Sequence, residues 1–170
     1  YTRYNPLAPA LMNATRFMQD AGGDAVKPTG GKSQAHILQA LVEAGIPTAS
    51  HIGLTPHTVA VLGGFKIQGR TASAAMKILE DAFAIQDAGC FMLEFEAVPA
   101  AIAAVISQQL EIPTIGIGAG VGTDGQILLC YDLLGVFVDF NQTFTKRFAN
   151  ITEVAVHGVG RNCSEAKCGT

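Results

Sequence analysis

The chain has 170 residues, of which 49% are hydrophobic and 15% charged, and its 11 Lys and Arg against 14 Asp and Glu give a formal net charge of -3. This length corresponds to one globular domain, and the apolar content excludes a disordered chain because it is sufficient to form a core. The absence of a basic cluster argues against nucleic-acid binding. No apolar stretch reaches the roughly 20 residues that a membrane span needs, so we expect a soluble protein.

Four cysteines occur along the chain, at Cys90, Cys130, Cys163 and Cys168. Their spacing contains no C-x-x-C pair of the kind typical of zinc or redox sites, which favours free thiols in a reducing compartment. Tyr1 is not an initiator methionine and nothing after it resembles a signal peptide. We therefore expect the chain to begin inside a longer protein.

One sequence pattern, or phrase, occurs three times: an amphipathic stretch ends in Ala-Gly, and a short apolar run follows directly. A glycine just past a helix supplies a left-handed conformation, and a buried parallel strand is a short run with weak alternation. Each phrase therefore predicts a helix-to-strand joint. The three phrases are Ala21-Gly22 before residues 24–27, Ala44-Gly45 before residues 46–51, and Ala88-Gly89 before residues 90–96.

The whole pattern alternates helices and strands, which predicts an α/β fold with a parallel sheet. Such a sheet is either open and doubly wound or part of a (β/α)₈ barrel. Helices are expected at about 9–21, 32–44, 71–87 and 99–110, and strands at 24–27, 46–51, 90–96 and 114–118.

Two further segments are less regular. Residues 126–134 fit a helix and a strand equally well. After residue 150 the pattern loses its period, so residues 1–150 are expected to form the domain and residues 151–170 a loosely ordered tail.

The strand ends carry the residues with useful chemistry, because ligands in parallel α/β folds bind at the carboxyl ends of the strands. Lys27, His51 and Glu96 lie there, together with a glycine run that begins at Gly116. A cation, an imidazole, a carboxylate and backbone amides could bind an anionic substrate and remove a proton beside a carbonyl.

Glu96 is the first candidate for the base, since a desolvated carboxylate has a raised pKa. The alternatives are a solvated strand end or a charge at a helix N-terminus. Glu94 lies on the same side of the strand by period 2 and is a competing candidate. From residue type alone, Lys27 is either a surface lysine or an anion ligand, and His51 is either structural or catalytic.

The glycines at 120, 122 and 125 satisfy the pattern G-x-G-x-x-G. The dinucleotide-binding fingerprint also needs an acidic residue about 20 positions on, whereas Asp132 and Asp139 are too close. Close backbone approach to a ligand, or tight packing, fits these glycines better than NAD binding.

Several ordered motifs between residues 22 and 150 resemble one enzyme family, the ketopantoate hydroxymethyltransferases. They are HIGLTP at 51–56, LGGFKIQGR at 62–70, EAVP at 96–99, IPTIGIGAG at 112–120 with DGQ at 124–126, and KRFAN at 146–150.

The resemblance implies a partial (β/α)₈ TIM barrel of the phosphoenolpyruvate/pyruvate-type superfamily, with roughly the first three βα units missing. It implies transfer of a hydroxymethyl group from 5,10-methylenetetrahydrofolate to 3-methyl-2-oxobutanoate, giving 2-dehydropantoate in pantothenate synthesis. It also implies a Mg²⁺ ion that polarises the keto acid. We expect a cytoplasmic homo-oligomer, or a mitochondrial one in a eukaryote, that binds a small molecule and neither nucleic acid nor membrane.

Residue by residue, Glu96 matches the proton acceptor of the family, Lys27 its substrate-binding lysine and His51 a histidine that lines the pocket. One departure concerns the metal. The family pattern after the lysine is Ile-Glu-Gly-Gly, where the Glu helps to hold magnesium, and this chain has Thr29 at that position. The other metal-binding aspartates lie upstream of the match, so we expect no metal ligand in this chain.

Two alternatives remain open. The chain is an inactive remnant that binds a keto acid or serves as an oligomer partner, with exposed strand edges that make it prone to associate. Otherwise it is a lyase of the same superfamily that acts on a 2-oxo acid. The lyase needs a nucleophilic cysteine, and neither Cys90 nor Cys130 is well placed for that role.

Overall fold

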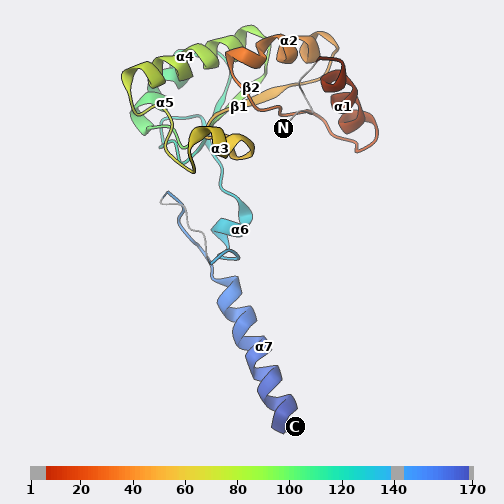
Figure 1. The fold of residues 1–170 in the computed structure, drawn as a ribbon, viewed down its shortest axis with the longest axis vertical. Coiled ribbons are helices and arrows are strands. Elements are labelled where there is room, and N and C mark those ends of the chain that lie inside the picture. The colour runs from red at the N-terminus through yellow and green to blue at the C-terminus, as the bar shows by residue number, and fades with distance from the viewer. Residues whose placement is uncertain (1–6, 139–143, 169–170) are drawn as a thin grey trace. The chain divides into compact units, whose positions relative to one another are not determined.

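The structure, a computed structural model, describes residues 7–138 and 144–168. The chain divides into two compact units, Tyr1–Ile127 and Leu128–Thr170, which we describe separately (Figure 1). The sequence predicts a boundary after residue 150, whereas the structure places it after Ile127.

The first unit contains a parallel sheet whose strands are neighbours in chain order, β1-β2-β3-β4. Its register aligns His51 with Glu94, and Glu94 with Ile115. Sequential parallel strands joined by helices are the repeat of a (β/α)₈ barrel, so the predicted fold class is confirmed as a partial barrel. The strands are β1 (Ala49–Gly53), β2 (Met92–Glu96), β3 (Thr114–Ile117) and β4 (Gly125–Gln126).

The predicted strand at residues 24–27 is not a continuous strand. This segment makes two isolated parallel bridges to the β1 side of the sheet, Val26 with Thr48 and Thr29 with His51. Pro28, between the two bridges, has no N–H to donate to a ladder. The segment therefore lies beside β1 without extending the regular sheet.

The four predicted helices are confirmed, with ends that differ by a few residues. The expected joints are confirmed as well, because Gly22, Gly45 and Gly89 have φ angles of 65°, 80° and 85°, in the left-handed region that glycine favours. The helices are α1 (Leu7–Gln19), α2 (Ala35–Glu43), α4 (Ala72–Asp87) and α5 (Ala100–Ser107). Three short elements add to them: η1 (Lys32–Gln34), η2 (Pro56–Thr58) and α3 (Val59–Leu62).

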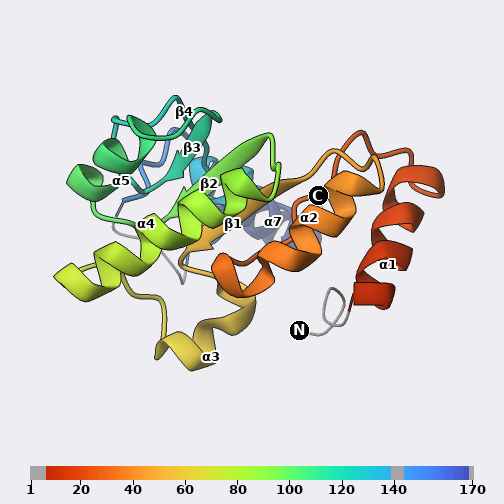
Figure 2. The same ribbon diagram turned by 90° about the horizontal axis from the view of Figure 1, so that it is seen from above.

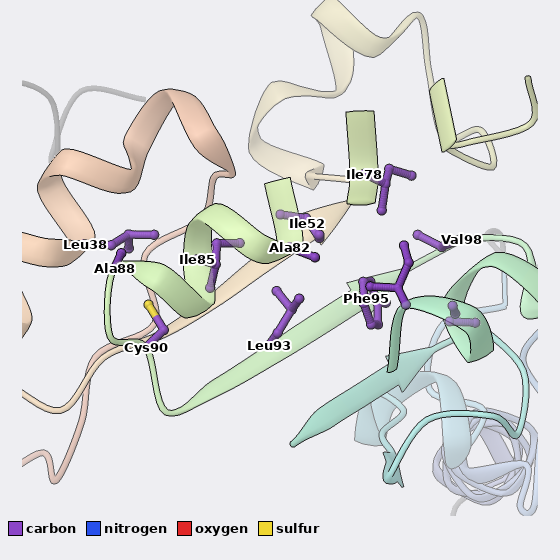
Figure 3. Close-up of a cluster of buried hydrophobic side chains, with 13 residues drawn as sticks. Leu38, Ile52, Ile78, Ala82, Ile85, Ala88, Cys90, Leu93, Phe95 and Val98 are labelled. Atoms are coloured by element: carbon purple, nitrogen blue, oxygen red, sulfur yellow. The ribbon is translucent and has the colours of Figure 1, made fainter. Parts of the chain in front are cut away.

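The main core lies between one face of the sheet and the helices α2, α4 and α5, which run along that face (Figure 2). Ile52 of β1 and both Leu93 and Phe95 of β2 point toward the helices, where Ile85 of α4 meets them (Figure 3). Alternate residues of a strand point to opposite faces, so the residues between them point to the other side of the sheet. A second, smaller cluster packs α1 against α2.

The glycines at 120 and 122 pack against helix α5. A Cβ atom on Gly120 would lie 2.3 Å from the Cβ of Ala100, and one on Gly122 would lie 2.4 Å from the Cβ of Ala104. Both distances are far below van der Waals contact. Tight packing therefore accounts for these glycines without a nucleotide.

The second unit contains α6 (Cys130–Leu133) and α7 (Ile151–Cys168). The ambiguous segment 126–134 includes both types of structure, because β4 ends at Gln126 and α6 follows. Residues 151–168, which the sequence predicts to belong to a loosely ordered tail, form one helix with none of its residues buried. Within the residues described, no helix is long and apolar enough to cross a membrane.

Candidate functional site

The face of the sheet opposite the helices is polar. His51 of β1 and both Glu94 and Glu96 of β2 point to this face, because Ile52, Leu93 and Phe95 between and beside them point to the core. Lys27 comes from the bridged segment next to β1, and its side chain reaches Glu94. We call Lys27, His51, Glu94 and Glu96 the polar cluster.

Glu94 lies at the centre of the cluster and is 2% exposed. One of its carboxylate oxygens, Oε2, accepts a hydrogen bond from the Lys27 ammonium and lies 3.2 Å from Nδ1 of His51. Burial by itself would raise the pKa of Glu94, but the hydrogen bonds and charges of His51 and Lys27 outweigh it and lower the pKa below the usual value. Glu94 is therefore ionised at neutral pH.

Glu96 is also buried, at 7% exposed, and its Oε2 lies 3.4 Å from Nε2 of His51. Burial raises the pKa of Glu96, the charges of His51 and Lys27 offset part of this rise, and the negative charge of Glu94 adds to it. The net direction is upward from the usual 4.5. A carboxylate of this kind has a higher affinity for a proton and is a better general base.

The backbone around Glu96 is fixed by hydrogen bonds from the segment that follows β1. The Leu54 N–H donates to the Glu96 carbonyl at 2.7 Å, and the Gln68 N–H donates to the Ala97 carbonyl at 2.8 Å. Ala97 has a φ of 51°, in the left-handed region that a residue with a Cβ rarely adopts. The chain therefore turns sharply directly after the candidate base.

Gly53 makes this close approach possible. Its φ is 90°, and a Cβ at this position would lie 2.3 Å from the Glu96 carbonyl oxygen. The ends of β1 and β2 therefore meet through a residue without a side chain, which keeps Leu54 within hydrogen-bonding distance of Glu96.

The structure brings together the three residues that the sequence selects, Lys27, His51 and Glu96. What sequence reasoning missed is the position of Glu94 between them. The period of 2 placed Glu94 on the correct face, but only as a competitor of Glu96. Its contacts with Lys27 and His51 depend on the register of three chain segments, for which a single sequence carries no direct signal.

The residues of this chain do not fit the magnesium ion that the family resemblance implies. Thr29 offers a neutral hydroxyl, and both carboxylates of the polar cluster already face cationic or hydrogen-bonding partners, whereas Mg²⁺ prefers uncommitted carboxylate oxygens. In the ranges that the structure describes, no group of three or more His, Cys, Asp or Glu could hold a metal ion.

Cys90, the cysteine of the first unit, does not supply a nucleophile to the polar cluster. Cys90 is buried in the main core, and burial raises the pKa of its thiol to about 11. Cys130 is exposed and belongs to the second unit. These positions disfavour the lyase alternative, which needs a reactive thiolate.

Residues 2–170 match the model of a family described as ketopantoate hydroxymethyltransferase. A protein of Methylibium petroleiphilum named 3-methyl-2-oxobutanoate hydroxymethyltransferase 1 is 76% identical over 169 residues, which are 99% of this chain and 58% of that protein.

Two more distant relatives are named 3-methyl-2-oxobutanoate hydroxymethyltransferase. That of Oleidesulfovibrio alaskensis is 50% identical over 94% of this chain and 55% of its own length. That of Nitratidesulfovibrio vulgaris is 46% identical over 95% of this chain and 52% of its own length. The chain therefore spans between half and three fifths of the length of these relatives.

Proposed function

The chain belongs to the ketopantoate hydroxymethyltransferase family, and on this premise we propose that its polar cluster removes the C3 proton of 3-methyl-2-oxobutanoate. The full reaction transfers a hydroxymethyl group from 5,10-methylenetetrahydrofolate to this acid and gives 2-dehydropantoate, a precursor of pantothenate. The observation that carries the proposal is the buried Glu96 at the end of β2, with its raised pKa and with His51 at 3.4 Å.

The anionic and cationic residues of the polar cluster have different roles, proton abstraction for Glu96 and substrate binding for Lys27. Glu96 accepts the proton as the C3–H bond breaks, and the electron pair of that bond forms the enolate. The side chain of Lys27 is 45% exposed, and its ammonium binds the carboxylate of the acid, since an ammonium has three donors and Glu94 takes one. Carbon C3 of the enolate then forms a bond with the one-carbon unit, and one water is consumed overall as tetrahydrofolate leaves.

The remaining expectations stay predictions. The family implies a folate donor, a homo-oligomeric state and a cytoplasmic location. It also implies a magnesium ion, which the residues of this chain do not fit. No step above passes through the metal.

The direct test is hydrogen-deuterium exchange at C3 of 3-methyl-2-oxobutanoate in D₂O, followed by NMR with and without Mg²⁺. It measures proton abstraction without folate. We expect exchange well above the buffer rate, and we expect Glu96→Gln to lower it by about 100-fold or more, because the amide cannot accept the proton.

The matched control is Glu111→Gln, which makes the same chemical change at an exposed residue outside the cluster. It should exchange at the wild-type rate. Exchange at the buffer rate in the wild-type protein, or unchanged exchange in Glu96→Gln, would contradict the proposal.

A further inference from the structure

Glu94 connects two basic side chains, those of Lys27 and His51, through a single atom. Oε2 of Glu94 is the partner of both the Lys27 ammonium and Nδ1 of His51. A carboxylate that is 3% exposed at its side chain is costly to ionise unless such partners compensate it. Glu94 therefore has a fixed place and a fixed charge, and it does not serve as a second base.

The hydrogen bonds around His51 determine its protonation. Nε2 lies 2.7 Å from the carbonyl oxygen of Leu54, which can only accept, so Nε2 carries a hydrogen. Nδ1 faces Glu94, and an ionised carboxylate can also only accept, so Nδ1 carries a hydrogen as well. Both ring nitrogens therefore face acceptors, and this hydrogen-bond geometry favours the doubly protonated ring, the imidazolium cation.

The cation lies directly beside the candidate base. The same Nε2 is 3.4 Å from Oε2 of Glu96, and the residues 51 and 94 are paired in register on adjacent strands. Thr29, the partner of His51 on its other side, is neutral. Of the two carboxylates that face the ring, Glu94 is the nearer, at 3.2 Å from Nδ1, and it lies directly opposite His51 in the register of the sheet.

We propose that Glu94 is a positioning residue, which holds His51 as an imidazolium against Glu96 and holds the Lys27 ammonium on the same face to bind the carboxylate of a 2-oxo acid. This rests on the proposed function, and it assigns Glu94 a role that differs from that of Glu96. Glu94 acts on the substrate only through its two neighbours, and its charge is needed throughout the reaction.

The first test does not need activity. The ¹⁵N chemical shifts of the His51 ring at neutral pH report whether both nitrogens are protonated. We expect an imidazolium in the wild-type protein and in Glu94→Asp, which keeps the carboxylate. We expect a neutral ring in Glu94→Gln. A neutral His51 in the wild-type protein would overturn the proposal, even if no variant folds.

The second test separates positioning from folding. In the C3 exchange assay, Glu94→Gln should lower kcat by about 100-fold, because the His51 ring loses the charged hydrogen-bond partner that orients it against Glu96. The Kd of 3-methyl-2-oxobutanoate should change by less than about threefold, because the amide oxygen of this variant still accepts a hydrogen bond from the Lys27 ammonium and keeps it on the same face. Glu94→Asp should recover part of kcat. A general loss of structure would instead weaken binding and turnover together, which would overturn the proposal.

The two proposals fail differently. If the wild-type protein shows no exchange but its His51 is an imidazolium that depends on Glu94, the proposed function is wrong and the positioning role of Glu94 is supported. If exchange requires Glu96 and is unaffected by Glu94→Gln, the function is supported and the positioning role is wrong.

Discussion

Glu94 and Glu96 lie two residues apart on β2 and face the same side of the sheet, yet their surroundings shift the two pKa values in opposite directions. The difference arises because Lys27 and His51 both form hydrogen bonds with Oε2 of Glu94, whereas Glu96 has a single ion-pair contact, with His51, and also feels the negative charge of Glu94. Two carboxylates with pKa values moved apart are suited to different roles, one as a fixed charge and the other as an acid or base.

The first prediction concerns pH. Glu96 must be ionised to accept a proton, and its folded-state pKa is raised, so the C3 exchange rate should increase as the pH rises through that pKa and then remain constant. The midpoint of the pH profile of kcat/KM should lie above pH 4.5, the usual pKa of a glutamate. The measurement is the exchange rate over the acidic and neutral range. A rate that falls as the pH rises through this range would contradict the assignment of Glu96 as the base.

The second prediction concerns Thr29. Thr29→Glu adds a carboxylate beside His51, at the position where the resembling family has its glutamate. We expect it to lower the Kd for Mg²⁺ by about tenfold, or about 1.4 kcal/mol, because a carboxylate is a better ligand for a hard cation than a hydroxyl. Calorimetric titration with MgCl₂ measures the change. Thr29→Gln has the same shape without the charge, and equal affinities of the two variants would refute the prediction.

The third prediction concerns Gly53. Gly53→Ala places a Cβ against the Glu96 carbonyl oxygen and forces a residue with a side chain to adopt a φ near 90°. The strain and the overpacking should together lower the free energy of unfolding by about 2–5 kcal/mol. The matched control is Gly45→Ala, where φ is 80° and no atom lies within 4 Å of the new Cβ. That control should cost only about 1–2 kcal/mol.

Denaturant unfolding of both glycine variants provides the measurement. Equal losses would show that the contact with Glu96 adds nothing to the cost of the backbone conformation. A larger loss for Gly53→Ala should be accompanied by slower C3 exchange, because the displaced Glu96 carbonyl moves the candidate base.

Local chemistry explains why much of the fold could be predicted. The Ala-Gly joints at Gly45 and Gly89 require a left-handed glycine, and this requirement is visible in the sequence. The segment near Lys27 was harder, because Pro28 interrupts the ladder and leaves only isolated bridges. Helix α7 was not predicted, since Gly158 and Gly160 have low helix propensity and its residues show no clear apolar period.

The candidate site could be predicted only in part, because part of it depends on long-range pairing rather than on local chemistry. The ends of parallel strands lie at one edge of a sheet, so Lys27, His51 and Glu96 could be expected to meet. The role of Glu94 depends on long-range pairing, because Lys27 and Glu94 are 67 residues apart in the chain and meet only when their segments align. Side-chain type and period do not contain that information.

The register of β1 and β2 has a consequence for how this scaffold can change. His51, Glu94 and Glu96 are held by strand pairing rather than by the conformation of a loop. The segment between Leu54 and Gln68 is joined to the end of β2 through backbone hydrogen bonds at its two ends. Its interior can therefore change in sequence or length, in evolution or in the laboratory, while the paired strands keep the side chains of His51, Glu94 and Glu96 in place.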